Sequence, residues 1–283
     1  MRIPRSEIVE RLRAQLANGR PVIGASAGTG LSAKCAANGG ADLIVIYNSG
    51  RYRMAGRGSS AGLLSFGDAN AIVAEMAGEV LPVAGNTPVL AGVCGTDPFR
   101  NMPLLLEDLA RLGFSGIQNF PTVGLFEGAT RQTFEETGLG YDREIELVRI
   151  AHDLDLLTMP YVFNEEQAAA MTAARADVVV PHMGTTTSGD IGALTAPTMD
   201  ESVRRTASMA EAARAVNPDV IVLCHGGPIA EPKDAQVIID RVPGVVGFVG
   251  ASSMERLPVE RAITQTVREF KSISIRSETH ARI

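Results

Sequence analysis

The sequence predicts an α/β protein whose strands and helices alternate to form a (β/α)8 TIM barrel, with an extra helix at the N-terminus. Eight short apolar runs occur along the chain, and each leads into a loop and usually into a helical pattern. The runs are continuously apolar rather than alternating, which is typical of strands buried on both faces. The length of 283 residues suits one barrel of about 250 residues with insertions.

The apolar runs place the strands, and the periodic segments between them place the helices. The predicted strands are 21–26, 43–48, 88–94, 116–120, 157–163, 177–183, 220–225 and 245–250. The predicted helices are 31–38, 68–81, 101–112, 131–137, 141–153, 165–175, 200–216, 234–241 and 258–272. An amphipathic helix at 6–18, within residues 1–19, precedes the first strand, and residues 275–283 form a polar tail. No linker interrupts the chain, so we expect residues 1–283 to form a single barrel domain.

Charge and composition limit the partners. The net charge of −6 argues against a nucleic-acid partner or an anionic membrane surface. No apolar run reaches the roughly 20 residues of a membrane-spanning helix, and the N-terminus lacks the apolar core of a secretory signal. The three cysteines are odd in number and lie in apolar runs, which is typical of reduced thiols. We therefore expect a cytoplasmic protein with no nucleic-acid or membrane partner.

Two loops late in the chain predict an anion-binding corner. The runs VIVLCHGGPI (220–229) and VVGFVGASSMERLP (245–258) each pass from an apolar strand into glycines and small polar residues. In TIM barrels, the loops after strands 7 and 8 frequently bind phosphate. The candidate contacts are Gly226, Gly227, Gly250, Ser252, Ser253 and the guanidinium of Arg256. None of the three lysines ends a strand, so a Schiff-base mechanism is not expected.

Two histidines are candidate acid–base residues. His182 and His225 end the adjacent strands 6 and 7, and neither belongs to the HExxH pattern of a zinc site. Cys94 ends strand 3 and is a candidate nucleophile if one of these histidines serves as its base. The alternative for Cys94 is a packing role.

The first glycine-rich loop does not predict a nucleotide site. The segment GASAGTGLSAK (24–34) has glycines near dinucleotide-binding spacing, but no acidic residue ends the next strand and the GK[ST] of a P-loop is missing. The loop is either a tight turn or a backbone cradle for a carboxylate or phosphate. No nucleotide or organic cofactor is therefore predicted.

A family resemblance appears at the first two strands. The segment LSAKCAANGGADLIVIYNSG (31–50) resembles the phosphoenolpyruvate mutase/isocitrate lyase superfamily. Across all eight βα units the chain is similar to the phosphoenolpyruvate hydrolase-like TIM-barrel family, with YNSGRYR, AGVCGTDPF, IQNFPTVGL, HGGPI and GASSMERLP as landmarks. The resemblance implies a site for a small anionic substrate, a 2-oxo acid or enol phosphate. The resemblance implies that Ser49 and Gly50 bind its carboxylate end, and Arg51 beside them would help to hold it. Asn48 and Asn119 are further candidate substrate-binding residues.

The resemblance also implies Mg2+, which superfamily members hold with acidic residues at the ends of strands 3 and 4. In this chain only Asp97 could serve as a carboxylate ligand, because Asn119 is neutral where an acid is expected. A hard cation is usually bound by several oxygens, most of them anionic. Asp97 fits equally well as the capping residue of a Thr-Asp-Pro turn.

We expect a hydrolase that acts on a small phosphorylated or phosphonylated 2-oxo or enol acid and releases pyruvate and phosphate. The strand 2 loop would hold the carboxylate and the loops after strands 7 and 8 the phosphoryl group, with room for a three-carbon acid between them. The alternatives are a lyase of the same superfamily that cleaves a C–C bond in a 2-oxo or 2-hydroxy diacid, and a barrel that senses a ligand without catalysis. By analogy with the superfamily, we also expect a homo-oligomer.

Overall fold

A computed structural model of the protein describes residues 2–275, so most of the predicted polar tail lies outside the described residues. Its strand segments are parallel and form one sheet in the order β5-β4-β3-β2-β1-β9-β8-β7-β6. They are β1 (Val22–Ser26), β2 (Leu43–Ile46), β3 (Val89–Gly92), β4 (Gly116–Gln118), β5 (Leu157–Thr158), β6 (Tyr161–Val162), β7 (Val178–Pro181), β8 (Ile221–Cys224) and β9 (Val245–Gly250).

The sheet closes into a barrel through the fifth predicted strand, which is divided into β5 and β6. The first segment pairs with β4 and the second with β7. Between them, the N–H of Met159 donates to the carbonyl of Ile117 at 3.0 Å, and the carbonyl of Pro160 accepts from the N–H of Val180 at 2.9 Å. The two segments therefore act as one barrel strand, and the predicted (β/α)8 fold is confirmed.

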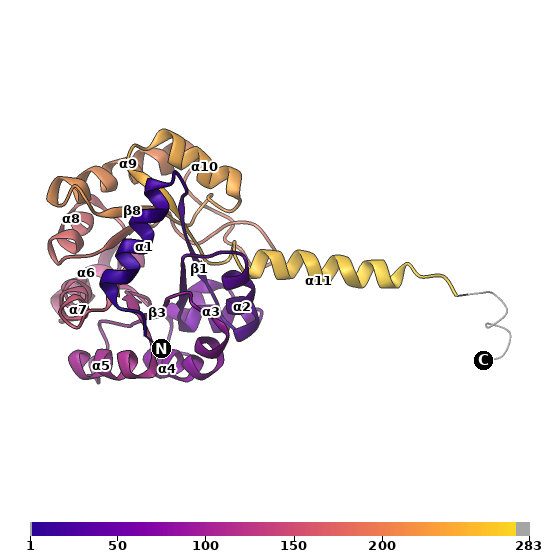
Figure 1. The fold of residues 1–283 in the computed structure, drawn as a ribbon, viewed down its shortest axis with the longest axis horizontal. Coiled ribbons are helices and arrows are strands. Elements are labelled where there is room, and N and C mark those ends of the chain that lie inside the picture. The colour runs from indigo at the N-terminus through magenta and orange to yellow at the C-terminus, as the bar shows by residue number, and fades with distance from the viewer. Residues whose placement is uncertain (1, 276–283) are drawn as a thin grey trace.

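Helices surround the barrel (Figure 1). They are α2 (Gly30–Asn38), α4 (Ala69–Val80), α5 (Met102–Leu112), α6 (Gly128–Glu136), α7 (Asp142–Asp153), α8 (Glu165–Ala173), α9 (Met199–Val216) and α10 (Pro232–Arg241). All of them were predicted. The structure adds the short helix α3 (Asn48–Met54) and the 3-10 turns η1 (Ser59–Leu63), η2 (Leu81–Val83) and η3 (Val123–Leu125). The sequence analysis missed α3 because its Asn-Ser-Gly start is poor in helix-forming residues.

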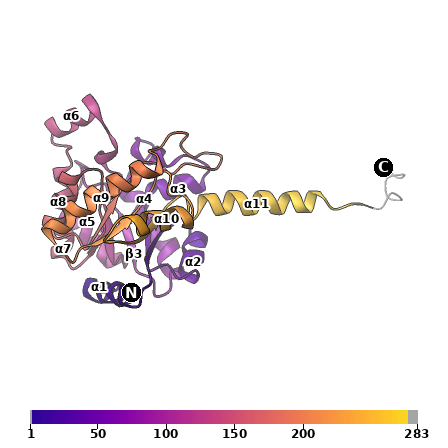
Figure 2. The same ribbon diagram turned by 90° about the horizontal axis from the view of Figure 1, so that it is seen from above.

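The two ends of the barrel differ. The N-terminal helix α1 (Arg5–Ala17) lies across the end where the strands begin, while α6 stands out from the opposite end (Figure 2). Ile8 and Leu12 of α1 are buried, and Arg5 forms an ion pair with Asp177 at 2.7 Å, next to the start of β7. The loops that follow the strands gather at the end away from α1, as expected for the functional face of a barrel.

The last helix, α11 (Arg256–Lys271), leaves the barrel instead of packing on it (Figures 1 and 2). Only Arg256 and Leu257 in its first turn are buried, and every residue from 261 to 275 is exposed. A regular (β/α)8 fold places the eighth helix against the outside of the barrel.

Within residues 2–275, none of the helices combines the length and the apolar character needed to cross a membrane.

Candidate active site

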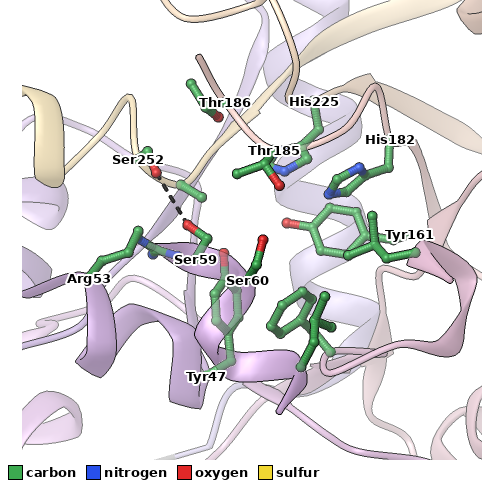
Figure 3. Close-up of a pocket in the computed structure, with 14 residues that line it drawn as sticks. Tyr47, Arg53, Ser59, Ser60, Tyr161, His182, Thr185, Thr186, His225 and Ser252 are labelled. Carbon is green, nitrogen blue, oxygen red and sulfur yellow. Dashed lines mark hydrogen bonds between the residues drawn. The ribbon is translucent and has the colours of Figure 1, made fainter. Parts of the chain in front are cut away.

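A small cavity lies at the mouth of the barrel, between the C-terminal ends of the strands (Figure 3). Its lining residues are Tyr47, Arg53, Ser59, Ser60, Leu63, Phe120, Leu125, Tyr161, His182, Thr185, Thr186, His225, Ala251 and Ser252. The volume of this cavity is about 30 Å³, and one water needs roughly 10–15 Å³. The expected room for a three-carbon acid is therefore not open in this conformation.

His182 and His225 lie side by side at this mouth, because the backbones that carry them form a parallel bridge. Their ring centroids are 4.7 Å apart. Nδ1 of His225 lies 2.7 Å from the carbonyl oxygen of Val249, which can only accept, so this nitrogen carries a proton. Nδ1 of His182 accepts the N–H of Gly184 at 3.0 Å, so the neutral ring carries its proton on Nε2. The remaining Nε2 atoms are therefore an acceptor on His225 and a donor on His182.

Both imidazole rings are neutral at pH 7. Burial lowers the pKa of His225 to about 4. Burial, and then the neighbouring His225 ring, hold the pKa of His182 well below its ordinary value. A neutral lone pair and a neutral N–H donor thus lie next to each other, which is an arrangement suited to moving a proton.

Tyr161 adds an unpaired hydroxyl. Its ring centroid lies 4.8 Å from that of His182 and 4.7 Å from that of His225. The side chain is buried, and its hydroxyl has no hydrogen-bond partner among the described residues. Figure 3 shows this hydroxyl directed into the cavity beside Ser60. Burial raises the pKa of Tyr161 well above its usual value, so the hydroxyl remains a proton donor.

A buried ion pair supplies the positive charge at the mouth. Arg53 donates from Nη2 to Glu255 at 2.7 Å and to Ser26 at 2.6 Å, and from Nε to Glu255 at 3.2 Å. The second oxygen of Glu255 accepts the N–H of Gly28 at 2.6 Å. Burial by itself lowers the pKa of Arg53, but the nearby Tyr47 and Glu255 outweigh it and raise the pKa above its ordinary value. Arg53 lines the mouth cavity, where its guanidinium lies over the ring of Tyr47, 5.3 Å from the ring centroid.

The turn η1 covers the mouth and engages side chains that we expected to bind the carboxylate. Ser49 Oγ donates to the carbonyl of Ser59 at 2.5 Å, and Asn48 Nδ2 donates to the carbonyl of Gly62 at 2.9 Å. A Cβ at Gly62 would collide with the hydroxyl of Ser49, so glycine is required for this close approach. Gly50 is buried against the loop after β1. In this conformation these residues hold the cover rather than line the cavity.

Cys94 and Asp97 lie apart from the histidines, in a second cavity of about 710 Å³ between the loops after β2, β3 and β4. Burial raises the pKa of Cys94, which opposes formation of a nucleophilic thiolate. The carboxylate of Asp97 accepts the N–H of Phe99 at 2.9 Å and the side-chain amide of Asn70 at 3.0 Å. Asp97 therefore caps a turn here, and the expected Cys–His pairing does not occur in this structure.

Asn119 is buried in a network that organises the loop after β4. Its amide donates to Glu144 at 2.6 Å and accepts the N–H of Tyr161 at 2.7 Å. Glu144 also accepts from the hydroxyl of Thr122 at 2.7 Å and the N–H of Val123 at 2.8 Å. Burial raises the pKa of Glu144 to about 7. Asn119 does not line the mouth cavity, and its contacts position Tyr161 instead.

Neither of the two arginines that we expected at the site reaches the cavity. Arg51 pairs with Glu75 at 2.7 Å on the outside of the barrel. Arg256 donates to Glu260 and to the carbonyl of Ser188, both at 2.9 Å, because the start of α11 turns it away from the mouth.

The predicted anion corner contributes one direct contact. Ser252 lines the cavity and its hydroxyl lies 3.4 Å from that of Ser59. Gly250 and Ser253 do not line the cavity. Gly226 and Gly227 have φ of 80° and 58°, and the N–H of Gly227 donates to the carbonyl of Gly184 at 2.8 Å. These two glycines therefore fix the loop after β7, which carries Thr185 and Thr186.

The donor set at the mouth does not fit a hard cation. None of the lining residues of the mouth cavity carries a carboxylate, and Glu255, which pairs with the lining residue Arg53, also accepts the N–H of Gly28. Across residues 2–275, no group of three or more histidine, cysteine, aspartate or glutamate side chains is arranged to hold a metal ion. Mg2+ prefers several oxygen ligands. Of the two carboxylates that line the neighbouring cavity, Asp68 pairs with Arg100 and Asp97 caps a turn.

Several mouth residues were not assigned to the site by sequence reasoning. Tyr47 lies at the end of the second strand run, a signal that could have found it by the same rule that selected the histidines. Arg53 lies two residues beyond Arg51, and only the helical turn of α3 directs it inward. Ser59 and Ser60 lie in a polar loop whose path no local pattern predicts.

Comparison with known proteins identifies the family of this chain. Residues 7–273 match the model of a family described as phosphoenolpyruvate hydrolase-like. The chain is 60% identical over 268 residues to the ToMV susceptible protein tm-1(GCR26) of Solanum lycopersicum, an alignment that covers 95% of this chain and 36% of the tomato protein. The chain thus spans about a third of this relative.

Solved structures share the fold at low sequence identity. A phosphoenolpyruvate phosphomutase from Streptomyces platensis subsp. rosaceus superposes with a TM-score of 0.58 at 16% identity, covering 92% of this chain and 86% of that one. A phosphonopyruvate hydrolase in complex with oxalate and Mg2+ gives a TM-score of 0.56 at 17% identity, covering 93% and 84%. Because the family model matches nearly the whole chain, this protein belongs to the phosphoenolpyruvate hydrolase-like family.

Proposed function

We propose that this protein is a hydrolase that removes the phosphoryl or phosphonyl group from a three-carbon 2-oxo or enol acid, releasing pyruvate and phosphate. The observation that carries the proposal is the pair of neutral imidazoles with opposite tautomers, His182 and His225, beside the unpaired hydroxyl of Tyr161. Membership of the phosphoenolpyruvate hydrolase-like family supports the substrate class.

The acid–base pair can serve both halves of the reaction. A water molecule attacks phosphorus and gives a proton to Nε2 of His225, while the bond from phosphorus to the enol oxygen or to carbon breaks. The electron pair stays on the three-carbon fragment as an enolate, and its carbon takes a proton from the hydroxyl of Tyr161 or from Nε2 of His182. The products are pyruvate and phosphate. General acid–base groups of this kind typically contribute about 10²- to 10⁴-fold to a rate.

The negative charge of the substrate would be bound mainly by hydrogen-bond donors, with one cationic side chain among them. The guanidinium of Arg53 offers a charged donor, and the hydroxyls of Ser59, Ser60 and Ser252 offer neutral ones. Hydrogen bonds from fixed donors in a cavity closed to water stabilise developing negative charge strongly.

Substrate entry requires η1 to move, because the cavity beneath it is too small. The turn is held by the hydrogen bonds from Ser49 and Asn48. When the turn lifts away, both donors become available to the substrate carboxylate. This step would restore the role that the family resemblance assigns to them.

Product analysis of the purified 283-residue chain tests the proposal. Phosphoenolpyruvate and phosphonopyruvate are each incubated with the protein, with added Mg2+ or with a chelator, and pyruvate and phosphate are both measured. The proposal expects equal amounts of the two products from at least one compound. Failure to turn over either compound under both metal conditions would refute it.

A ligand-binding barrel without catalysis is the second candidate. The closed mouth favours it, and so does the lack of a metal donor set among residues 2–275. Isothermal titration calorimetry with oxalate and with phosphonopyruvate separates the two, since tight binding without any product would select the binding role. Pyruvate formed from a 2-oxo or 2-hydroxy diacid without phosphate would instead indicate a C–C lyase.

A further inference from the structure

We propose that Glu144 is a positioning residue for the mouth of the barrel. Its carboxylate fixes the side-chain amide of Asn119 in one orientation, and that amide holds the backbone of Tyr161. This role rests on the proposed hydrolase activity, in which the hydroxyl of Tyr161 can protonate the enolate. Glu144 does not line the mouth cavity, so it acts on the reaction only through Asn119 and Tyr161.

The backbone ladder between the fourth and fifth barrel strands stops short of Tyr161. Its bond nearest to that residue runs from the N–H of Met159 to the carbonyl of Ile117 at 3.0 Å. Just beyond β4 the backbone turns back on itself, where the N–H of Phe120 donates to the carbonyl of Gln118 at 3.0 Å. The backbone on this side therefore leaves Tyr161 to another partner, although a regular parallel ladder would continue to it.

The side chain of Asn119 takes the place of that backbone. Its Oδ1 accepts the N–H of Tyr161 at 2.7 Å, and its Nδ2 donates to the carbonyl of the same residue at 3.2 Å. On the opposite side, the ladder to β7 continues, because the carbonyl of Val162 accepts the N–H of His182 at 2.9 Å. Tyr161 thus lies between two neighbours, and Asn119 is the one that sets its distance from β4.

Glu144 selects the orientation of the Asn119 amide. An asparagine amide can turn over, which exchanges its donor and its acceptor. Oε2 of Glu144 lies 2.6 Å from Nδ2 of Asn119. In the reverse orientation Oδ1 would face this carboxylate, and Nδ2 would face the N–H of Tyr161. Glu144 and Asn119 are both 0% exposed, so water cannot relieve these mismatches, which are strongly unfavourable when buried.

The surroundings of Glu144 require a side chain with two acceptor oxygens. Besides Asn119, the hydroxyl of Thr122 donates to Oε2 at 2.7 Å and the N–H of Val123 donates to Oε1 at 2.8 Å. A glutamine would replace one of these oxygens with an amide donor. The N–H of Val123 cannot turn over to accept that donor, whereas the amide of Asn119 can. We therefore expect Glu144→Gln to invert Asn119.

Inversion of Asn119 would release the backbone of Tyr161 and displace its hydroxyl. The ring centroid of Tyr161 lies 4.8 Å from that of His182 and 4.7 Å from that of His225, and Figure 3 shows the three side chains around the cavity. The hydroxyl has no hydrogen-bond partner among residues 2–275, so its place depends on the backbone that carries it. A displacement of about 1 Å can lower a rate by about 100-fold.

A polarity swap tests the orientation of the amide. In Glu144→Gln the new amide needs an acceptor at position 119, and Asn119→Asp supplies one that can still accept the N–H of Tyr161. The double variant should therefore recover most of what Glu144→Gln loses. It gives up only the bond to the carbonyl of Tyr161, which also accepts from the hydroxyl of Tyr141. Asn119→Asp alone places two carboxylates side by side and should be impaired.

Hydrogen exchange at the backbone amide of Tyr161 measures this contact without an activity assay. Labelling with nitrogen-15 tyrosine gives four backbone signals, because the chain has four tyrosines, and Tyr161→Phe identifies the relevant one. Relative to the other three, we expect Glu144→Gln to speed its exchange by about 10- to 100-fold, equivalent to ~1.4–2.7 kcal/mol, and the double variant to restore it. Thr122→Val removes a different donor to Glu144, so this matched control should keep the wild-type ratio.

Steady-state kinetics of phosphate release tests the positioning role itself. We expect Glu144→Gln to lower kcat by about 10- to 100-fold and to leave KM unchanged, because every donor that lines the cavity is retained. The double variant should recover most of kcat, and Thr122→Val should keep the wild-type value.

Two results would overturn the proposal. One is an unchanged exchange ratio at Tyr161 in Glu144→Gln. The other is faster exchange with an unchanged kcat, which would leave Glu144 a structural role only. If wild type turns over neither phosphoenolpyruvate nor phosphonopyruvate, it is the proposed hydrolase that fails, while the exchange ratios still show whether Glu144 holds Tyr161.

Discussion

Replacing Glu255 with glutamine tests how much the buried ion pair beneath the mouth contributes to stability. The substitution keeps the size of the side chain and removes its charge. Both members of the pair are 1% exposed, and Nη2 of Arg53 lies 2.7 Å from Glu255. The variant leaves the Arg53 guanidinium buried without its countercharge, and loss of one partner of a buried pair typically costs about 3–5 kcal/mol. We expect the free energy of unfolding to fall by that amount.

Glu75→Gln is the matched control, because it breaks an ion pair of similar length on the surface. Arg51 and Glu75 also lie 2.7 Å apart, but their side chains are 32% and 70% exposed. Exposed pairs contribute about 0–1 kcal/mol, because water and salt screen the charges. Urea denaturation followed by circular dichroism measures both variants. If Glu255→Gln lowers the free energy of unfolding no more than Glu75→Gln does, Arg53 does not form the buried ion pair that the structure indicates.

Three further substitutions test the surroundings of the mouth. Glu144→Gln should flatten the dependence of stability on pH. Burial raises the pKa of Glu144 from 4.5 to about 7, so the free energy of unfolding of wild type falls by ~3 kcal/mol as pH rises from 4.5 to 7. Urea denaturation at several pH values measures this difference. Tyr161→Phe should raise the free energy of unfolding by ~1 kcal/mol, since it removes a buried unpaired hydroxyl. The same variant should form pyruvate and phosphate more slowly than wild type. Gly62→Ala should push η1 off Ser49, cost ~1–3 kcal/mol and increase proteolysis within 55–67, whereas Gly78→Ala, which meets no neighbouring atom, should not destabilise the protein.

The strands were predictable because their signal is local. Each barrel strand is apolar on both faces, so a short continuous run identifies it without knowledge of its neighbours. The same reasoning placed His182 and His225 together, since strand ends of a barrel share one face. The division of the fifth strand at Met159-Pro160 was also within reach, because proline lacks the N–H that would continue a strand ladder.

Side chains that reach the site across long sequence distances were not predictable from local patterns. Arg53 and Glu255 are separated by 202 residues, and nothing near either one indicates the other. Arg51 seemed the better ligand from its place in the loop, yet the turn of α3 directs it outward. Glu144 lies in the first turn of α7, where acidic residues are common. Only the folded chain brings it within hydrogen-bond distance of Asn119.

The final helix shows a different limit. Its periodicity predicted α11 with nearly correct bounds. A local pattern states which face of a helix is apolar, but it does not state which molecule covers that face. That α11 leaves the barrel between α10 and α2 became visible only in the structure.

The most direct test of the proposed hydrolase compares phosphate release by wild type, His225→Asn and His152→Asn under identical conditions. His152 lies on α7 away from the mouth, so its variant controls for the loss of a histidine. We predict that His225→Asn lowers the rate by about 10²- to 10⁴-fold and that His152→Asn leaves it unchanged. We also predict that the wild-type rate falls only as pH drops towards about 4, where His225 gains its proton. A His225→Asn variant that keeps the wild-type rate would contradict the assignment of the mouth as the active site.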